Sequence, residues 1–130
     1  MDYFVNEGNR IGGQEPQALG TAQARITATV AVTKGMVVES TGDWTVGPAA
    51  DASVAVVGIA ANSAAIGERV VIETEGFVKL TATNAAIVAG NTVSAGGAGL
   101  IKVWAVAGDI VGKVIKGCAA NGVAYVKLRG

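Results

Sequence analysis

The chain has 130 residues and a mass of 12.9 kDa, which fits one domain of ordinary size and leaves no room for two full ones. Hydrophobic residues make up 51% of it, charged residues 15%, and ten basic residues balance ten acidic ones. This composition excludes a disordered, solvated chain. Zero net charge also removes the simplest electrostatic argument for a direct nucleic-acid partner.

No stretch of the sequence predicts a transmembrane helix, because the longest one without a charge, 80–101, is interrupted by polar residues and glycines. The first ten residues lack the basic start and apolar run of a secretory signal. The single cysteine, Cys118, cannot form an internal disulfide. We therefore expect a protein that is made in a reducing compartment and has no membrane partner.

The sequence contains no histidine. This removes the commonest general base, the usual zinc ligand and every nucleophile system that depends on an imidazole. Cys118 lies near Lys116 but has no histidine to activate it, so we interpret it as a small apolar side chain. We expect no catalytic residue, no cofactor and no metal site, and the protein is predicted not to be an enzyme.

One alternative is a carboxylate enzyme or a carbohydrate-binding module. Glu73 and Glu75 are two residues apart in a segment predicted to be extended, so their side chains share one face. Trp44 and Trp104 would then supply aromatic platforms. Aromatic residues make up only 5% of the chain, however. The favoured interpretation is that the two glutamates belong to a solvated strand face.

In chain order, residues 1–24 come first and are predicted to form an extended N-terminal arm, because they follow neither a helical nor a strand period. Such a segment cannot offset its ordering entropy alone. It nevertheless carries apolar side chains: Tyr3, Phe4, Val5, Ile11 and Leu19. The arm is interpreted either as a terminal strand docked on its own domain or as a segment that orders against another subunit by strand addition.

Residues 25–130 are predicted to form a β body. Apolar residues alternate with threonine and alanine over 26–33, a pattern typical of a half-buried strand. Asn121-Gly122 is the clearest hairpin signal, and 84–89 is the one predicted helical turn. The fold class is therefore mostly β, a small β-sandwich or barrel-like body, with further strands at 36–39, 44–46, 54–60, 69–74, 77–81, 92–94, 100–106, 110–115 and 123–128.

A weak internal repeat, at a shift of about 50 residues, predicts two similar β units that pack together. The matched segments are 34–38 with 89–93, 56–58 with 110–112, and 78–80 with 126–128. Small apolar side chains favour thin sheet-on-sheet packing, and open strand edges need cover. The apolar content leaves area to bury between subunits, so we expect the protein to form oligomers.

The middle of the chain resembles the small capsid cement, or head decoration, proteins of tailed bacteriophages. The resemblance covers about residues 35–95 and rests on the order of a short strand, a turn, a hairpin and a further segment. In this sequence they read VGIA at 57–60, AAIGE at 64–68, VVIETEGFVKL at 70–80 and AIVAGNTV at 86–93. Asn91 stands where the family pattern usually has Asp, at a position with a turn role.

The resemblance implies a non-enzymatic β protein, a homotrimer, located in the virion on the outer capsid surface after synthesis in the host cytoplasm. Its partners would be the major capsid protein, whose neighbouring subunits it joins on the expanded head, and other copies of itself. On this interpretation the arm residues Tyr3, Phe4, Val5, Ile11 and Leu19 are capsid-facing anchors, and Arg10, Glu15 and Arg25 form polar contacts at the rim. The alternative is another virion β module, from a tail, fibre or baseplate, or a cellular β-sandwich assembly subunit.

Overall fold

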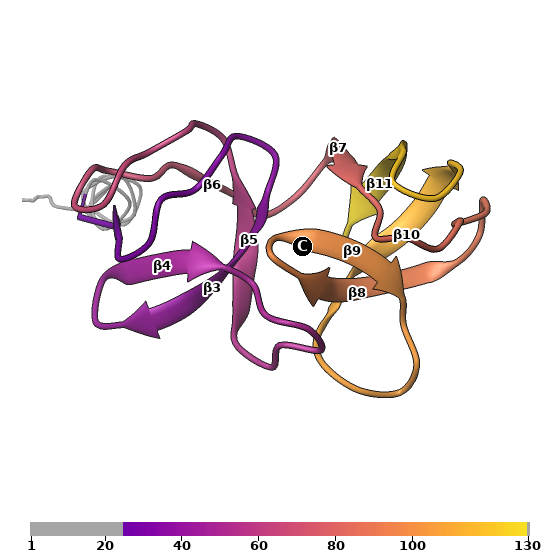
Figure 1. Cartoon of the computed structure of the whole chain (residues 1–130), viewed down its shortest axis with the longest axis horizontal. Coiled ribbons are helices and arrows are strands. Elements are labelled where there is room, and N and C mark those ends of the chain that lie inside the picture. The colour runs from indigo at the N-terminus through magenta and orange to yellow at the C-terminus, as the bar shows by residue number, and fades with distance from the viewer. Residues whose placement is uncertain (1–24, 130) are drawn as a thin grey trace, which may run out of the picture.

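The computed structural model describes residues 25–129, which form two five-stranded sheets (Figure 1). The first sheet contains β2 (Thr27–Ala28), β3 (Val37–Gly42), β4 (Thr45–Pro48), β5 (Val56–Ala60) and β6 (Ile72–Glu73). The second contains β7 (Phe77–Thr81), β8 (Thr92–Gly97), β9 (Leu100–Val103), β10 (Ile110–Lys116) and β11 (Val123–Leu128). We call residues 25–75 the first unit and residues 76–129 the second unit. The predicted mostly β body of two units is confirmed.

Both sheets bend round until their ends meet. The first has the order β2-β4-β3-β5-β6, and Thr27 of β2 bridges to Arg69, a few residues before β6. The second has the order β7-β11-β10-β8-β9, and Ala82, directly after β7, bridges in parallel to Ile101 of β9. When each sheet is followed as a closed ring and the second is read in the opposite direction, β7-β9-β8-β10-β11, the two strand orders are the same. In this match β2 is equivalent to β7 and β6 is equivalent to β11. Each unit is therefore a small barrel-like body of the same topology.

Individual hydrogen bonds confirm the repeat at an offset of about 55 residues. The Gly35 amide donates to the Ala60 carbonyl at 2.8 Å, and the Gly90 amide donates to the Val114 carbonyl at the same distance. The first two matched segments of the sequence are therefore equivalent in structure. The third match is wrong, because 78–80 and 126–128 lie on neighbouring strands of the second unit, where Val78 pairs with Val126.

Two glycines allow equivalent strands to approach closely. A Cβ atom built on Gly58 would lie 2.5 Å from the carbonyl oxygen of Glu73, and one on Gly112 would overlap the carbonyl oxygen of Lys127. Gly58 lies in β5 against β6, and Gly112 lies in β10 against β11. A strand glycine at such a position permits backbone contact that no side chain would allow.

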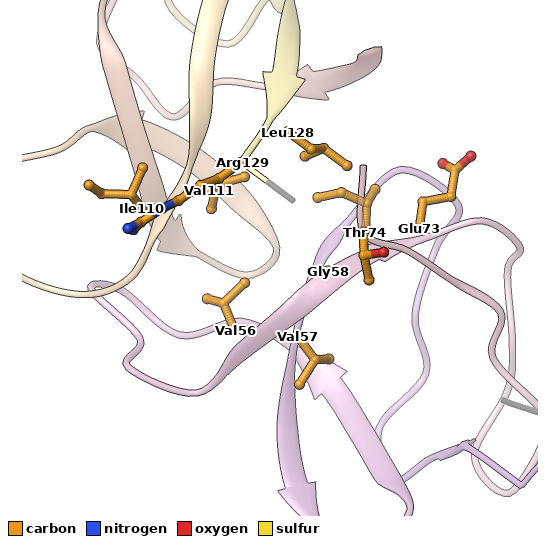
Figure 2. Close-up of a pocket in the computed structure, with 10 residues that line it drawn as sticks. Val56, Val57, Gly58, Glu73, Thr74, Ile110, Val111, Leu128 and Arg129 are labelled. Atoms are coloured by element: carbon orange, nitrogen blue, oxygen red, sulfur yellow. The ribbon is translucent and has the colours of Figure 1, made fainter. Parts of the chain in front are cut away.

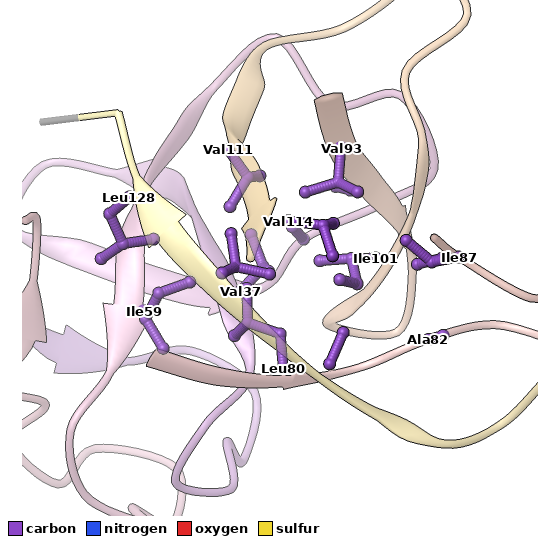
Figure 3. Packing of buried hydrophobic residues seen from close by; sticks show 14 residues of the cluster. Val37, Ile59, Leu80, Ala82, Ile87, Val93, Ile101, Val111, Val114 and Leu128 are labelled. Carbon is purple, nitrogen blue, oxygen red and sulfur yellow. The ribbon is translucent and has the colours of Figure 1, made fainter. Parts of the chain in front are cut away.

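The first unit has its own apolar core, whose buried members are Ala28, Val32, Val38, Val46, Ala60, Ala64, Val70 and Ile72. A second core fills the second unit and also takes in Val37, Ala49 and Ile59 of the first. Figure 3 shows Val37 and Ile59 among the side chains of the second unit. The second unit therefore packs against the outer side of β3 and β5.

The strand pair that carries this contact differs between the two units. Val37 pairs with Ile59 across β3 and β5, and the pair in the same place of the second unit is Thr92 with Lys113, across β8 and β10. Backbone contacts add to the junction, because the Val37 amide donates to the Gly99 carbonyl at 3.0 Å. The first unit thus buries an apolar pair where the second unit presents a polar one.

Several local predictions differ from the structure. The strand expected over 26–33 is limited to Thr27–Ala28, and Val30, at 54% exposed, does not continue the buried side. The helical turn predicted at 84–89 is wrong. Ile87 instead forms an antiparallel bridge with Cys118 and is buried, as the equivalent of Val32 bridging Ala64. The burial of Ile87 in the core of the second unit overrides the local cap-and-glycine signal.

Two connections also differ from expectation. The segment 70–80, expected to be a hairpin from the family pattern, does not fold back on itself, because β6 pairs with β5 and β7 pairs with β11. It is the link between the units. Asn121 does adopt a positive φ of 61°, but it lies in a connection from Lys116 to Val123 that is longer than a two-residue turn. No membrane-spanning helix occurs among residues 25–129.

Candidate interaction surfaces

Arg25 is the first described residue, and its side chain lies over Trp44 in the turn between β3 and β4. Its guanidinium carbon is 5.4 Å from the centroid of the Trp44 ring, within range of a cation–π interaction. Trp44 is 48% exposed and has a φ of 59°, which the turn imposes. The hairpin therefore presents an aromatic ring at the point where the predicted arm joins the body.

An apolar groove lies beside this ring. It encloses about 290 Å³ and is lined by Trp44 of the β3–β4 turn and by residues of β3, β4, β5 and β6, among them Val57 and Ile72. Ile26 and Thr74 complete its walls. Few polar groups point into it, so its surface suits contact with another apolar surface more than recognition of a small polar ligand.

A second opening, the inter-unit cleft, lies between the two units (Figure 2). It also encloses about 290 Å³, with Val56, Val57 and Thr74 on one side and Val111 and Leu128 on the other. Glu73 and Arg129 lie at its margin, and Figure 2 shows their charged ends pointing away from each other. Val57 and Thr74 line both openings, so the groove and the cleft are neighbours.

The charges, which cancel over the whole chain, separate between the units. The first unit carries three basic and six acidic residues, a net charge of −3, whereas the second carries six basic residues and only Asp109, a net charge of +5. The basic residues are Arg25, Lys34 and Arg69 in the first unit, and Lys79, Lys102, Lys113, Lys116, Lys127 and Arg129 in the second. The balanced total of ten basic and ten acidic residues hides this division, which appears only when each unit is counted separately.

Most of these lysines occupy one side of the second sheet. We define the basic face by six exposed residues on three adjacent strands: Phe77 and Lys79 of β7, Tyr125 and Lys127 of β11, and Lys113 and Lys116 of β10. The pairing register places Lys127 opposite both Phe77 and Lys113, and Lys79 opposite Tyr125. The three strands contain no acidic residue. Phe77 is 69% exposed and Tyr125 43%, so aromatic rings lie between the charges.

Glu39 has a structural role at the junction of the units. Its Oε1 accepts a hydrogen bond from the Ala50 amide at 3.0 Å. This bond, with a second from the Ser53 side chain, lowers the pKa of the Glu39 carboxyl, and burial opposes the shift more weakly. The carboxylate thus holds the loop between β4 and β5, which the Ala52 amide anchors to the Ala95 carbonyl of the second unit.

The structure brings together only part of the alternative carbohydrate site. Glu73 and Glu75 are exposed beside Thr74, which lines the same groove as Trp44. Trp104 lines neither the groove nor the cleft, and its Nε1 donates to the Gly108 carbonyl at 3.2 Å. Among residues 25–129, no cluster of cysteine, aspartate and glutamate could hold a metal ion.

Of the predicted capsid-binding residues, only Arg25 belongs to the described part, where it is exposed above Trp44. The others lie outside the described residues: Tyr3, Phe4, Val5, Arg10, Ile11, Glu15 and Leu19. Their role stays a prediction.

No protein-family model and no curated protein matches the chain. Its fold is similar to that of a solved structure, the N base of head fiber gp8.5 in bacteriophage phi29, with a TM-score of 0.61. The alignment covers 79% of this chain and 89% of that one, at 13% sequence identity. At this identity the likeness establishes a shared fold.

Proposed function

We propose that the chain is a structural protein of a phage virion, a decoration or cement protein that binds the outer surface of the expanded head and joins neighbouring major capsid protein subunits. It acts as a homotrimer and has no catalytic role. The observation that carries the proposal is the fold shared, over most of the chain, with the base of a phage head fibre. The family resemblance of residues 35–95 supports it independently.

The surface of the body suits an adhesive role. The apolar groove and the exposed Trp44 lie next to Arg25, where the arm with its apolar residues joins the body. Contact with another copy or with the capsid would remove apolar area from water, at about 25 cal/mol per Å². A virion component of this kind contributes contact area rather than bond-making chemistry.

The experiment mixes purified full chain with expanded heads that lack their decoration protein, followed by co-sedimentation and imaging of the particles. We expect the full chain to coat the heads, and a chain without residues 1–20 to lose binding while keeping its circular dichroism spectrum and melting temperature. Val106→Asn is the control: it removes one exposed apolar side chain from the second unit, where Val106 is 83% exposed, and should leave binding to the heads unchanged. Unchanged binding by the truncated chain would contradict the assignment of the arm.

A fibre component is the second candidate, because the similar structure is itself the base of a head fibre. Antibody labelling of intact virions separates the two. Labels spread over the whole head surface favour a decoration protein, whereas labels confined to projecting fibres or to the tail favour a fibre, tail or baseplate module.

A further inference from the structure

We propose that the basic face of one copy docks on the apolar groove of a second copy, between the carboxylates of Asp43, Glu73 and Glu75. The contact would join the second unit of one chain to the first unit of the next. This inference rests on the self-association that the proposed function includes, and it names the two surfaces involved. It does not depend on capsid binding.

The basic face is arranged to meet negative charge. Lys113 and Lys127 lie directly opposite each other on β10 and β11, and like charges at such positions destabilise a sheet. Within the described residues the ion pair is Lys102 with Asp51, and none of the four lysines of the basic face pairs with a carboxylate. A negatively charged partner would relieve this repulsion, and no carboxylate among residues 25–129 of the same chain forms an ion pair with Lys113 or Lys127.

The first unit offers a surface of the required charge. Asp43 precedes Trp44 in the hairpin, and Glu73 and Glu75 flank Thr74, so all three carboxylates are sequence neighbours of residues that line the groove. All three side chains are exposed. Two cations are nearby: the Arg25 guanidinium is positioned over the Trp44 ring, and Arg129 lines the adjoining cleft with Glu73. Three of the six acidic residues of the first unit thus adjoin groove residues in sequence, while the groove itself is mostly apolar.

The two surfaces also match in their apolar parts. The basic face carries the rings of Phe77 and Tyr125, and the Lys116 ammonium lies 5.9 Å from the Tyr125 ring centroid. The groove offers Trp44 and Val57 as counterparts. Interfaces of this type combine aromatic anchors at the centre with charge pairs that set orientation.

A contact between two different surfaces of the same chain is heterologous, so repeated copies close into a ring or continue as a filament. A ring of three copies is the form that agrees with the predicted homotrimer. In that ring the basic face of each copy occupies the apolar groove of the next copy.

The test measures the mass of the full chain by sedimentation velocity at about 0.1 M and about 1 M NaCl, between which the Debye length falls from about 10 Å to about 3 Å. We expect an oligomer at low salt whose dissociation constant rises at least tenfold at high salt. Lys113→Glu with Lys127→Glu should weaken association at least tenfold, and so should Glu73→Lys with Glu75→Lys. A variant with all four changes restores opposite charges and should associate again.

Arg69→Glu is the control, because it reverses an exposed charge of the first unit at a residue that lines neither the groove nor an opening shared with the basic face, and it should leave association intact. Melting curves establish that each variant is folded. A monomeric wild-type chain overturns the proposal, and heparin binding by that monomer, lost on reversing Lys113 and Lys127, would assign the face to a polyanion. An oligomer insensitive to both reversals also overturns it but leaves the capsid-binding proposal standing.

Discussion

Val37 and Val38 are consecutive residues of β3 that lie in different hydrophobic cores. Val38 is buried in the core of the first unit, whereas Val37 is buried in the core shared with the second unit, and each has 0% exposure. Because side chains alternate along a strand, one strand can serve two cores. Ile59 and Ala60 of β5 repeat the arrangement. β3 and β5 thus form a shared wall between the units.

Truncation of Val37 should therefore destabilise the whole protein although it lies outside the first unit's own core. We expect Val37→Ala to lower the free energy of unfolding by roughly 2 kcal/mol, through lost burial and a residual cavity. Urea unfolding measures the change. Val30→Ala, at a residue that is 54% exposed, is the control and should have a far smaller effect. Equal effects of the two changes would contradict the shared core.

Gly112 and Gly58 should tolerate no side chain. Gly112→Ala places a methyl group against the carbonyl oxygen of Lys127 and should cost about 2–3 kcal/mol of stability, as overpacking typically does. Gly47→Ala is the control, since a Cβ there would lie 3.4 Å from the Thr41 side chain, an ordinary contact. Thermal melting compares the variants. A wild-type melting temperature for Gly112→Ala would show that β10 and β11 are not so close.

Replacement of Ser94 by alanine should stabilise the folded protein. It is fully buried in β8, and its hydroxyl finds no hydrogen-bond partner among residues 25–129. Ser94→Ala removes that unsatisfied group and should raise the free energy of unfolding by about 1 kcal/mol. Ser53→Ala is the contrasting change, because the Ser53 hydroxyl accepts a hydrogen bond from the Ala55 amide. Loss of stability in both variants would mean that Ser94 has a partner in solution.

Glu39 should make stability depend on pH. Its pKa in the folded state is lowered below the ordinary value of 4.5, chiefly by the bond from the Ala50 amide. Its contribution is therefore fully present above the unfolded-state pKa and is lost as pH falls through the folded-state pKa. The stability difference between wild type and Glu39→Gln should shrink as unfolding is measured from pH 7 toward pH 3. A constant difference over that range would contradict this role.

The sequence predicts the strands more reliably than their closure. Alternating apolar residues and glycine-marked turns locate most strands, and the match of 34–38 with 89–93 predicts the repeat correctly. The bridge between Ala82 and Ile101 leaves no local signal, because it joins the two ends of the strand order, β7 and β9, between which the other three strands of the sheet lie. The match of 78–80 with 126–128 fails for a related reason, since neighbouring strands of similar composition can imitate a repeat.

The interaction surfaces were harder to predict. A net charge of zero conceals the opposite charges of the two units, although a count by segment would have found them. Lys79, Lys113 and Lys127 become neighbours only through the strand order β7-β11-β10. The pairing of Arg25 with Trp44 likewise depends on the closure of the first unit, which brings residue 25 to the β3–β4 hairpin.

The pair formed by Thr92 and Lys113 is the polar counterpart of Val37 and Ile59 in the first unit. In the first unit the apolar pair is covered by the next unit in the chain, whereas in the second unit a hydroxyl and an ammonium group stand at the same place, which suits a polar or charged partner. The two units therefore share a topology but not a docking surface. The exchange of one pair of side chains is enough to give one barrel an apolar neighbour and the other a charged outer face.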